Sequence, residues 1–106
     1  MIFITGKFSR FLEGVLMAYK NNTWGTVCDD VFEEIDAQAA CHTLGFNGLT
    51  EFQTHYDSGF TRPAVPIAMD NVGCTPSTAN FVKCKYSKCP GNTCCSHTED
   101  ILLTCN

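Results

Sequence analysis

Eight cysteines in a chain of 106 residues are the feature that most restricts how this sequence can fold. An even and dense cysteine count in so short a chain is typical of a disulfide framework formed in an oxidising compartment. A redox or zinc protein that uses Cys89, Cys94 and Cys95 is the alternative. Zinc sites usually contain C-x-x-C pairs or regularly spaced histidines, and the sequence has neither pattern. The cysteines therefore favour an extracellular protein held together by disulfides.

Length and charge exclude several classes of protein. The length fits one domain, residues 1–106. No stretch approaches the ~18–20 continuous apolar residues of a membrane span, so we expect no direct membrane insertion. The net charge is −4, and no basic stripe is present to neutralise phosphates, which argues against nucleic acid as a partner.

The first third of the chain predicts β-strands. Residues 2–4 and 15–19 are apolar, β-prone runs, and residues 24–28 form a third after the turn residues Asn21-Asn22-Thr23. The last two runs predict a hairpin. Asn21-Asn22-Thr23 also matches N-x-[ST], so Asn21 is a candidate glycosylation site at the hairpin tip, and an unmodified turn is the alternative.

The pattern changes period at Asp36. Ala37, Ala40, Cys41 and Leu44 recur at helical spacing, and Gly45 follows them, which predicts a helix over residues 36–44 with Cys41 facing inward. Residues 46–66 carry scattered turn residues and predict an irregular segment. Strands are expected at 66–72 and 101–104, a short helical or extended turn at 79–82, and a turn at 89–93.

Two cysteines are each followed by acidic residues. Asp29 and Asp30 follow Cys28 directly, and Glu99-Asp100 comes shortly after Cys95. If Cys28 and Cys95 are bonded, four carboxylates are drawn into one small volume. Carboxylates repel one another, so such a cluster requires a cation or a set of hydrogen-bond donors.

Four motifs in order resemble the scavenger receptor cysteine-rich (SRCR) domain: W-G-T-V-C-D-D (24–30), D-A-Q-A-A-C-H-T-L-G-F (36–46), P-I-x-M-D-N-V-x-C (66–74) and C-x-H-x-E-D-x-x-x-x-C (95–105). The likeness covers essentially the whole chain. It implies an α+β fold, in which a curved antiparallel sheet cradles one α-helix. It also implies a non-enzymatic module outside the cell.

The resemblance selects disulfides from the 105 pairings that eight cysteines allow. It implies Cys28–Cys95, Cys41–Cys105 and Cys74–Cys84. One subclass of the family has a further disulfide, but Leu12 and Phe46 occupy the positions of its two cysteines in this chain. The chain therefore resembles the six-cysteine, group A-like subclass. Cys89 and Cys94 remain as an extra pair. An exchange in which Cys94 instead of Cys95 bonds Cys28 stays open.

The resemblance implies a weak Ca²⁺ or Mg²⁺ site at Asp29, Asp30 and Glu99, since both ions prefer oxygen ligands. From residue types alone the alternative is favoured, in which Asp29 and Asp30 accept backbone hydrogen bonds and Glu99 pairs with a lysine. Asp70 and Asn71 are a second candidate cation site.

The expected ligand is a protein or a microbial or polyanionic surface, and no organic cofactor is expected. The candidate contacts for anionic ligands are Arg62, Lys83, Lys85 and Lys88, with ordinary surface lysines as the alternative. No catalytic motif is present. An ancillary role within a larger secreted enzyme or receptor is the other function considered.

Overall fold

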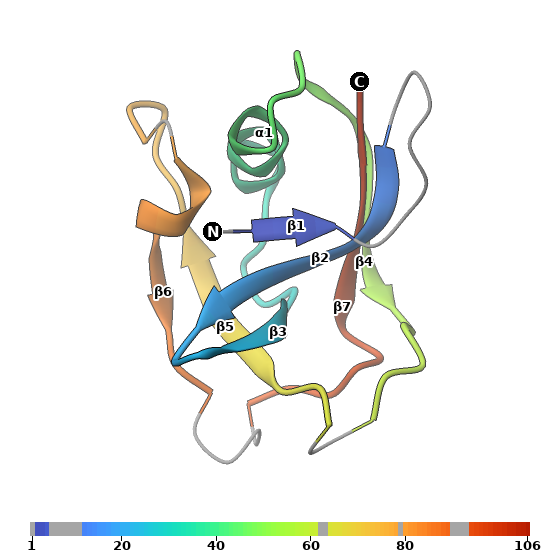
Figure 1. Ribbon diagram of the computed structural model, residues 1–106. Coiled ribbons are helices and arrows are strands. Elements are labelled where there is room, and N and C mark those ends of the chain that lie inside the picture. Colours follow the sequence, from blue (N-terminus) through green and yellow to red (C-terminus); the bar gives the residue numbers. More distant parts are fainter. Residues whose placement is uncertain (1, 5–11, 62–63, 79, 90–93) are drawn as a thin grey trace.

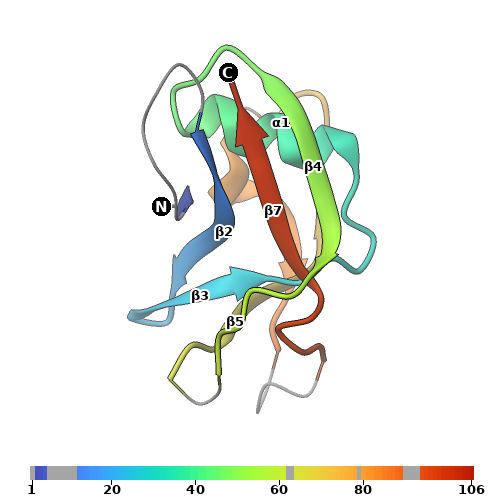
Figure 2. The ribbon, with the colours of Figure 1, turned by 90° about the vertical axis from the view of Figure 1, so that its right-hand side faces the viewer.

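The computed structural model describes residues 2–4, 12–61, 64–78, 80–89 and 94–106, in which one curved sheet wraps around one helix (Figures 1 and 2). The strands follow the order β4-β7-β2-β3-β5-β6, and β1 pairs with β2 outside this path. Their bounds are β1 (Ile2–Ile4), β2 (Leu12–Lys20), β3 (Thr23–Val27), β4 (Leu49–Tyr56), β5 (Ile67–Gly73), β6 (Lys85–Ser87) and β7 (Asp100–Cys105). The helix α1 is Glu34–Thr43, and a short 3-10 turn, η1, is Phe81–Lys83.

The predicted hairpin is confirmed as β2 and β3. Lys20 pairs with Thr23 across a two-residue turn, and Asn21 and Asn22 both have positive φ, 51° and 64°. Positive φ at both central residues defines a type I′ turn, whose backbone twist matches the twist of the two strands that it connects. Asparagine tolerates this conformation better than other residues with a Cβ atom, which explains the Asn-Asn sequence.

One pairing departs from the antiparallel sheet that the resemblance implied. β3 and β5 run parallel, with Thr26 N–H donating to Pro66 O at 3.0 Å and Cys28 N–H donating to Met69 O at 2.8 Å. Parallel neighbours need a long crossover connection, and here α1 and β4 lie between the two strands in sequence. The sheet is therefore mixed. This pairing also brings Asp70 beside the end of β3.

Two strands were not predicted. The segment 46–66, expected to be irregular, contains β4, which pairs with β7 at the edge of the sheet. Most of its side chains are exposed, so the buried-exposed alternation that identifies a strand is weak. The strand β6 pairs with β5, and its three residues are too few to show an alternating pattern. The expected turn at 89–93 falls mainly outside the described residues.

The helix begins with a reciprocal cap. Asp36 Oδ2 accepts a 2.7 Å hydrogen bond from Glu33 N–H, while the Glu33 side chain accepts one from the Asp36 N–H. This arrangement satisfies two donors at the start of α1. Asp36 is only 1% exposed, and its other oxygen accepts a 2.8 Å bond from Cys74 N–H just after β5. It therefore fixes the helix to the sheet as well as starting it.

The core lies between α1 and the concave face of the sheet. The alanines and Cys41 of α1 meet apolar residues of β2, β5 and β7, and Phe32 packs edge-on against Phe52 at a ring separation of 5.7 Å. The predicted inward face of the helix is confirmed. Figure 2 shows α1 behind β2, β7 and β4. No helix among the described residues has the length and apolar run needed to cross a membrane.

The four disulfides are Cys28–Cys95, Cys41–Cys105, Cys74–Cys84 and Cys89–Cys94. They are the pairs that the sequence analysis named. Cys41–Cys105 joins α1 to β7, and Cys28–Cys95 joins the end of β3 to the segment before β7. Because all eight sulfurs are in disulfides, this form of the protein has no thiolate for zinc binding or thiol chemistry.

Candidate cation site

Two acidic loops meet where β3 ends and β7 begins. Besides the disulfide between Cys28 and Cys95, the main-chain N–H of Asp29 donates a 3.0 Å hydrogen bond to Glu99 O. Both the covalent bond and the backbone bond therefore fix one loop against the other. The side chains of Asp29, Asp30 and Glu99 are brought to the same place.

We define the acidic cluster as Asp29, Asp30, Asp70 and Glu99. Oxygen atoms of Asp30 and Glu99 lie within 4.8 Å of each other, and the same holds for Asp29 and Glu99, with a nitrogen of His55 inside the same limit. Cys95 Sγ lies 3.8 Å from Asp30 Oδ2 and 4.0 Å from Asp70 Oδ1, so Asp70 borders the same sulfur from the β5 side.

Asp70 was expected in a second, separate site with Asn71. In the structure Asp70 Oδ1 and Asp30 Oδ2 border the same Cys95 sulfur, while Asn71 is exposed and its N–H donates to Asp70 Oδ1 at 2.9 Å. Burial raises the pKa of Asp70 above its ordinary value, the Asn71 hydrogen bond opposes this, and the neighbouring Asp30 and Glu99 raise the pKa further. Asp70 thus adjoins the first expected site across the Cys95 sulfur.

Asp29 has a structural partner that the sequence analysis did not identify. Its Oδ2 accepts a 2.7 Å hydrogen bond from His55 N–H and lies 3.0 Å from His55 Nδ1. Burial raises the pKa of Asp29, His55 lowers it, and the charges of Glu99 and Asp30 raise it. His55 lies in β4 with a φ of 55°, where the pairing register between β4 and β7 shifts. No pattern in the sequence predicted this shift. Asp29 therefore combines the structural role considered above with a place in the acidic cluster.

Glu99 has a short-range partner in the backbone of its own loop. Its Oε2 accepts a 3.2 Å bond from Ser96 N–H. Among the described residues no lysine or arginine lies within 4.0 Å of a carboxylate in the acidic cluster, so the expected lysine pair of Glu99 is absent there. The Glu99 carboxylate thus lies close to those of Asp29 and Asp30, with the exposed His55 ring beside Asp29 and Glu99.

The donor set fits a hard divalent cation. Carboxylate oxygens from three chain segments surround the Cys28–Cys95 bond, and disulfide sulfurs are poor ligands for Ca²⁺ or Mg²⁺. Asp30 and Glu99 are partly exposed, which leaves space for water or a ligand to complete a coordination shell. The residues that would hold the ion are Asp29, Asp30, Asp70 and Glu99.

His97 and Asp100 lie next to the acidic cluster but form a buried structural network. His97 Nδ1 is 2.9 Å from Asp100 Oδ2, and His97 Nε2 donates to Val65 O at 2.6 Å. Ser58 Oγ donates to the same Asp100 oxygen at 2.6 Å. Both ring nitrogens are therefore occupied in attaching the segment around Val65 to the start of β7. Asp100, the fourth acid of the two sequence pairs, faces this network.

The basic residues lie on a different part of the surface. Lys83 is in η1, Lys85 is in β6 and Lys88 follows β6, and all three are exposed. Arg62, the remaining candidate contact for anions, lies outside the described residues. Asn21 is exposed at the β2–β3 turn.

Comparisons with known proteins agree with this architecture. The family model of the scavenger receptor cysteine-rich domain matches residues 6–106. Among curated proteins, lysyl oxidase homolog 2 of Bos taurus is 35% identical over 103 residues, which cover 97% of this chain and 13% of that protein. Lysyl oxidase homolog 3B of Danio rerio is 33% identical over 98 residues, covering 92% of this chain and 12% of that protein. The chain thus spans about one eighth of the length of these relatives.

Solved structures show the same fold. The SRCR domain of mouse MARCO, in its dimeric form, superposes with a TM-score of 0.76 at 29% identity, covering 96% of this chain and 94% of that one. The third SRCR domain of murine neurotrypsin gives 0.70 at 33% identity, covering 88% and 84%. The chain belongs to the scavenger receptor cysteine-rich domain family, because the family model matches it and because its disulfide-bonded mixed sheet around one helix matches the fold of the solved SRCR domains.

Proposed function

We propose that this chain is an extracellular, non-catalytic ligand-binding module that uses a divalent cation, Ca²⁺ or Mg²⁺, at the acidic cluster. The observation that carries the proposal is that Glu99 lies close to both Asp29 and Asp30, with Asp70 beside the same disulfide, and that no lysine or arginine lies within 4.0 Å of these carboxylates among the described residues. A cation relieves the repulsion among these carboxylates.

The cation gives the module a way to bind anionic groups. Protein oxygens from a shallow, partly exposed cluster leave coordination positions open, and a carboxylate or sulfate of a protein or microbial surface can fill them. The loops that carry the acids are fixed by the disulfide and by the Asp29–Glu99 backbone bond, so they lose little conformational freedom on binding. Affinity for the ion alone should be weak, with a Kd of the order of 10⁻⁴–10⁻³ M, as for other extracellular modules.

Calcium titration followed by amide chemical shifts tests the proposal. We expect the parent to shift at residues around Cys28 and Cys95, and Asp30→Asn and Glu99→Gln to weaken binding by about tenfold or more, a loss of about 1.4 kcal/mol each. Gln at position 99 retains an acceptor for Ser96 N–H. The matched control is Glu51→Gln on the exposed edge strand β4, which should bind as the parent does.

Two results would count against the cation. One is a parent that shows no localised shifts at about 10 mM calcium, well above the expected Kd. The other is a Glu51→Gln variant that loses as much affinity as Asp30→Asn, since that would reduce the effect to overall charge.

A second function is favoured by the comparisons. The chain matches only 12–14% of each lysyl oxidase homolog, so its relatives are parts of larger proteins. In this second proposal the module positions a neighbouring domain. The test is to introduce Asp30→Asn and Glu99→Gln into a longer protein that contains this module. If the variants lose cation binding but keep every activity of that protein, the result favours a positioning role over ligand recognition.

A further inference from the structure

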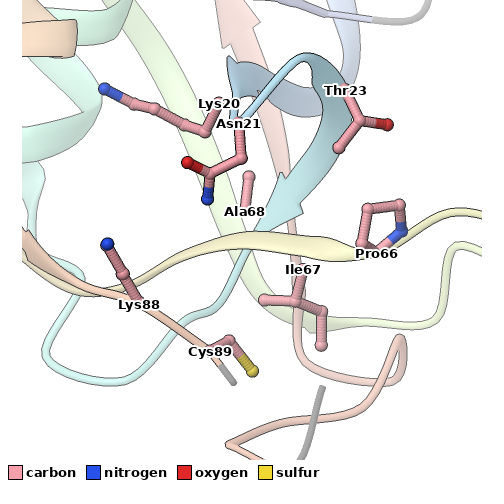
Figure 3. Close-up of a pocket in the computed structure, with 8 residues that line it drawn as sticks. All are labelled: Lys20, Asn21, Thr23, Pro66, Ile67, Ala68, Lys88 and Cys89. Atoms are coloured by element: carbon pink, nitrogen blue, oxygen red, sulfur yellow. The ribbon is translucent and has the colours of Figure 1, made fainter. Parts of the chain in front are cut away.

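The β2–β3 turn lies beside a pocket lined by residues of β2, β3, β5 and the segment after β6. The pocket has a volume of about 250 Å³, and its lining residues are Lys20, Asn21, Thr23, Pro66, Ile67, Ala68, Lys88 and Cys89. Asn21 and Ala68 both line this pocket, and Figure 3 shows the Asn21 amide extending from the turn toward the side where Lys20 and Lys88 lie.

The Asn21 side-chain amide makes no structural contact that explains it in the described part of the chain. No hydrogen bond to its side chain is formed there, and the residue is exposed. The positive φ of Asn21 explains why an asparagine suits the turn. It does not explain Thr23, which is exposed at the first position of β3 and completes the sequence's single N-x-[ST] motif.

The walls of the pocket suit an N-acetylated sugar. Pro66, Ile67 and Ala68 give an apolar floor for the acetyl methyl group and one sugar face. Lys88 is exposed, with no carboxylate within 4.0 Å among the described residues, so its ammonium group is available to sugar oxygens. Lys20 is held in place, since its Nζ donates to Val82 O at 3.3 Å and lies 4.7 Å from the centre of the Tyr86 ring.

We propose that Asn21 carries an N-linked glycan and that its first N-acetylglucosamine lies in this pocket. In the transfer step, Asn21 Nδ2 attacks C1 of an oligosaccharide carried on a lipid diphosphate. The C1–N bond forms, the bond from C1 to the diphosphate oxygen breaks, the lipid diphosphate leaves, and one Nδ2 proton is lost. The first sugar thus begins where the amide ends, inside the pocket. The inference is independent of the cation at the acidic cluster.

Intact mass tests the modification. The full chain is secreted from animal cells and weighed before and after treatment with peptide-N-glycosidase, which converts a glycosylated Asn to Asp. We expect a glycan on the parent and on Thr23→Ser, and none on Thr23→Val. Asn21→Asp serves as the control for the deglycosylated chain, because it has the same covalent structure. A secreted, folded parent without added mass, or with added mass that persists in Thr23→Val, overturns the proposal.

A second experiment tests the position of the sugar. An endoglycosidase that cuts between the two core sugars leaves a single N-acetylglucosamine on Asn21. We expect nuclear Overhauser contacts between its acetyl methyl group and the Ala68 methyl group, and changed amide shifts at Lys88 relative to Asn21→Asp. Ala68→Leu fills the pocket, so it should abolish the shift at Lys88 while leaving glycan occupancy unchanged. A glycosylated parent without these contacts contradicts the placement of the sugar.

Discussion

Asp29 N–H is hydrogen-bonded to Glu99 O at 3.0 Å, so the two acidic loops are aligned by the backbone as well as by the neighbouring Cys28–Cys95 disulfide. Cys28 N–H is in turn bonded to Met69 O, the residue before Asp70. Main-chain bonds thus set the positions of the segments that carry the acidic cluster. Asp30→Asn and Glu99→Gln should therefore each remove one negative charge without displacing the loops.

Removal of the Cys28–Cys95 disulfide should cost more stability than removal of Cys89–Cys94. The two bonds span 67 and 5 residues in sequence. From the entropy of loop closure, replacing Cys28 and Cys95 by alanine should lower the free energy of unfolding by about 4 kcal/mol, and replacing Cys89 and Cys94 by about 2 kcal/mol. Urea unfolding of the two double variants measures both. Equal losses would show that loop length does not determine the effect.

Stability should rise as the pH falls from neutral through the raised pKa values of Asp29 and Asp70. Both carboxyls titrate above their ordinary value of 3.8 in the folded protein, chiefly because of burial. The folded state therefore binds these protons more tightly than the unfolded state, and protonation favours folding. Their contribution is lost as the pH rises through the raised values. Thermal unfolding between about pH 7 and pH 4 measures this trend.

The matched control for this trend is Asp70→Asn, which keeps an acceptor for Asn71 N–H and cannot titrate. The difference in Tm between the parent and this variant should narrow as the pH falls, since the parent loses the charge that the variant lacks. Calcium should stabilise the parent less at the acidic end, because protons compete for the same oxygens. A difference that is independent of pH would contradict the raised pKa of Asp70.

Gly25→Ala should destabilise the parallel pairing of β3 and β5. A Cβ atom at Gly25 would lie 2.7 Å from Pro66 O and 2.9 Å from Ala68 N, closer than van der Waals contact allows. The backbones must separate, and we expect a loss of about 1–3 kcal/mol in the free energy of unfolding. Gly73→Ala is the control, since its Cβ would meet no atom within 4 Å. Similar behaviour of both variants in urea would refute the close approach.

Local patterns in the sequence identified the elements whose burial is regular. α1 shows one apolar face, and residues 15–18 of β2 are all buried, so each gave a clear signal. β4 gave none, because an edge strand with mostly exposed side chains has little apolar periodicity. The motif resemblance supplied three of the disulfides, which spacing alone does not determine, and Cys89–Cys94 followed as the remaining pair.

The composition of the acidic cluster was only partly predictable. Asp29, Asp30 and Glu99 follow cysteines that bond to each other, so their meeting was expected. Asp70 reaches the cluster through the parallel pairing of β3 and β5, and His55 reaches Asp29 at a shift in the β4–β7 register. Both contacts depend on long-range pairing between strands, which no local run of residues encodes.

Asp36 should contribute to stability without contributing to cation binding. Its two oxygens accept hydrogen bonds from Glu33 N–H and Cys74 N–H, and the side chain is buried. Asp36→Ala removes the helix cap and leaves a partly buried N–H without a partner, and the two losses together are about 2–4 kcal/mol. Glu34→Gln, an exposed neighbour in the same turn, should change stability by no more than about 0.5 kcal/mol. Urea unfolding measures the loss, and calcium titration of the same variants should give unchanged affinity, because Asp36 lies outside the acidic cluster. If Asp36→Ala were no less stable than Glu34→Gln, the link between α1 and Cys74 would have no energetic role.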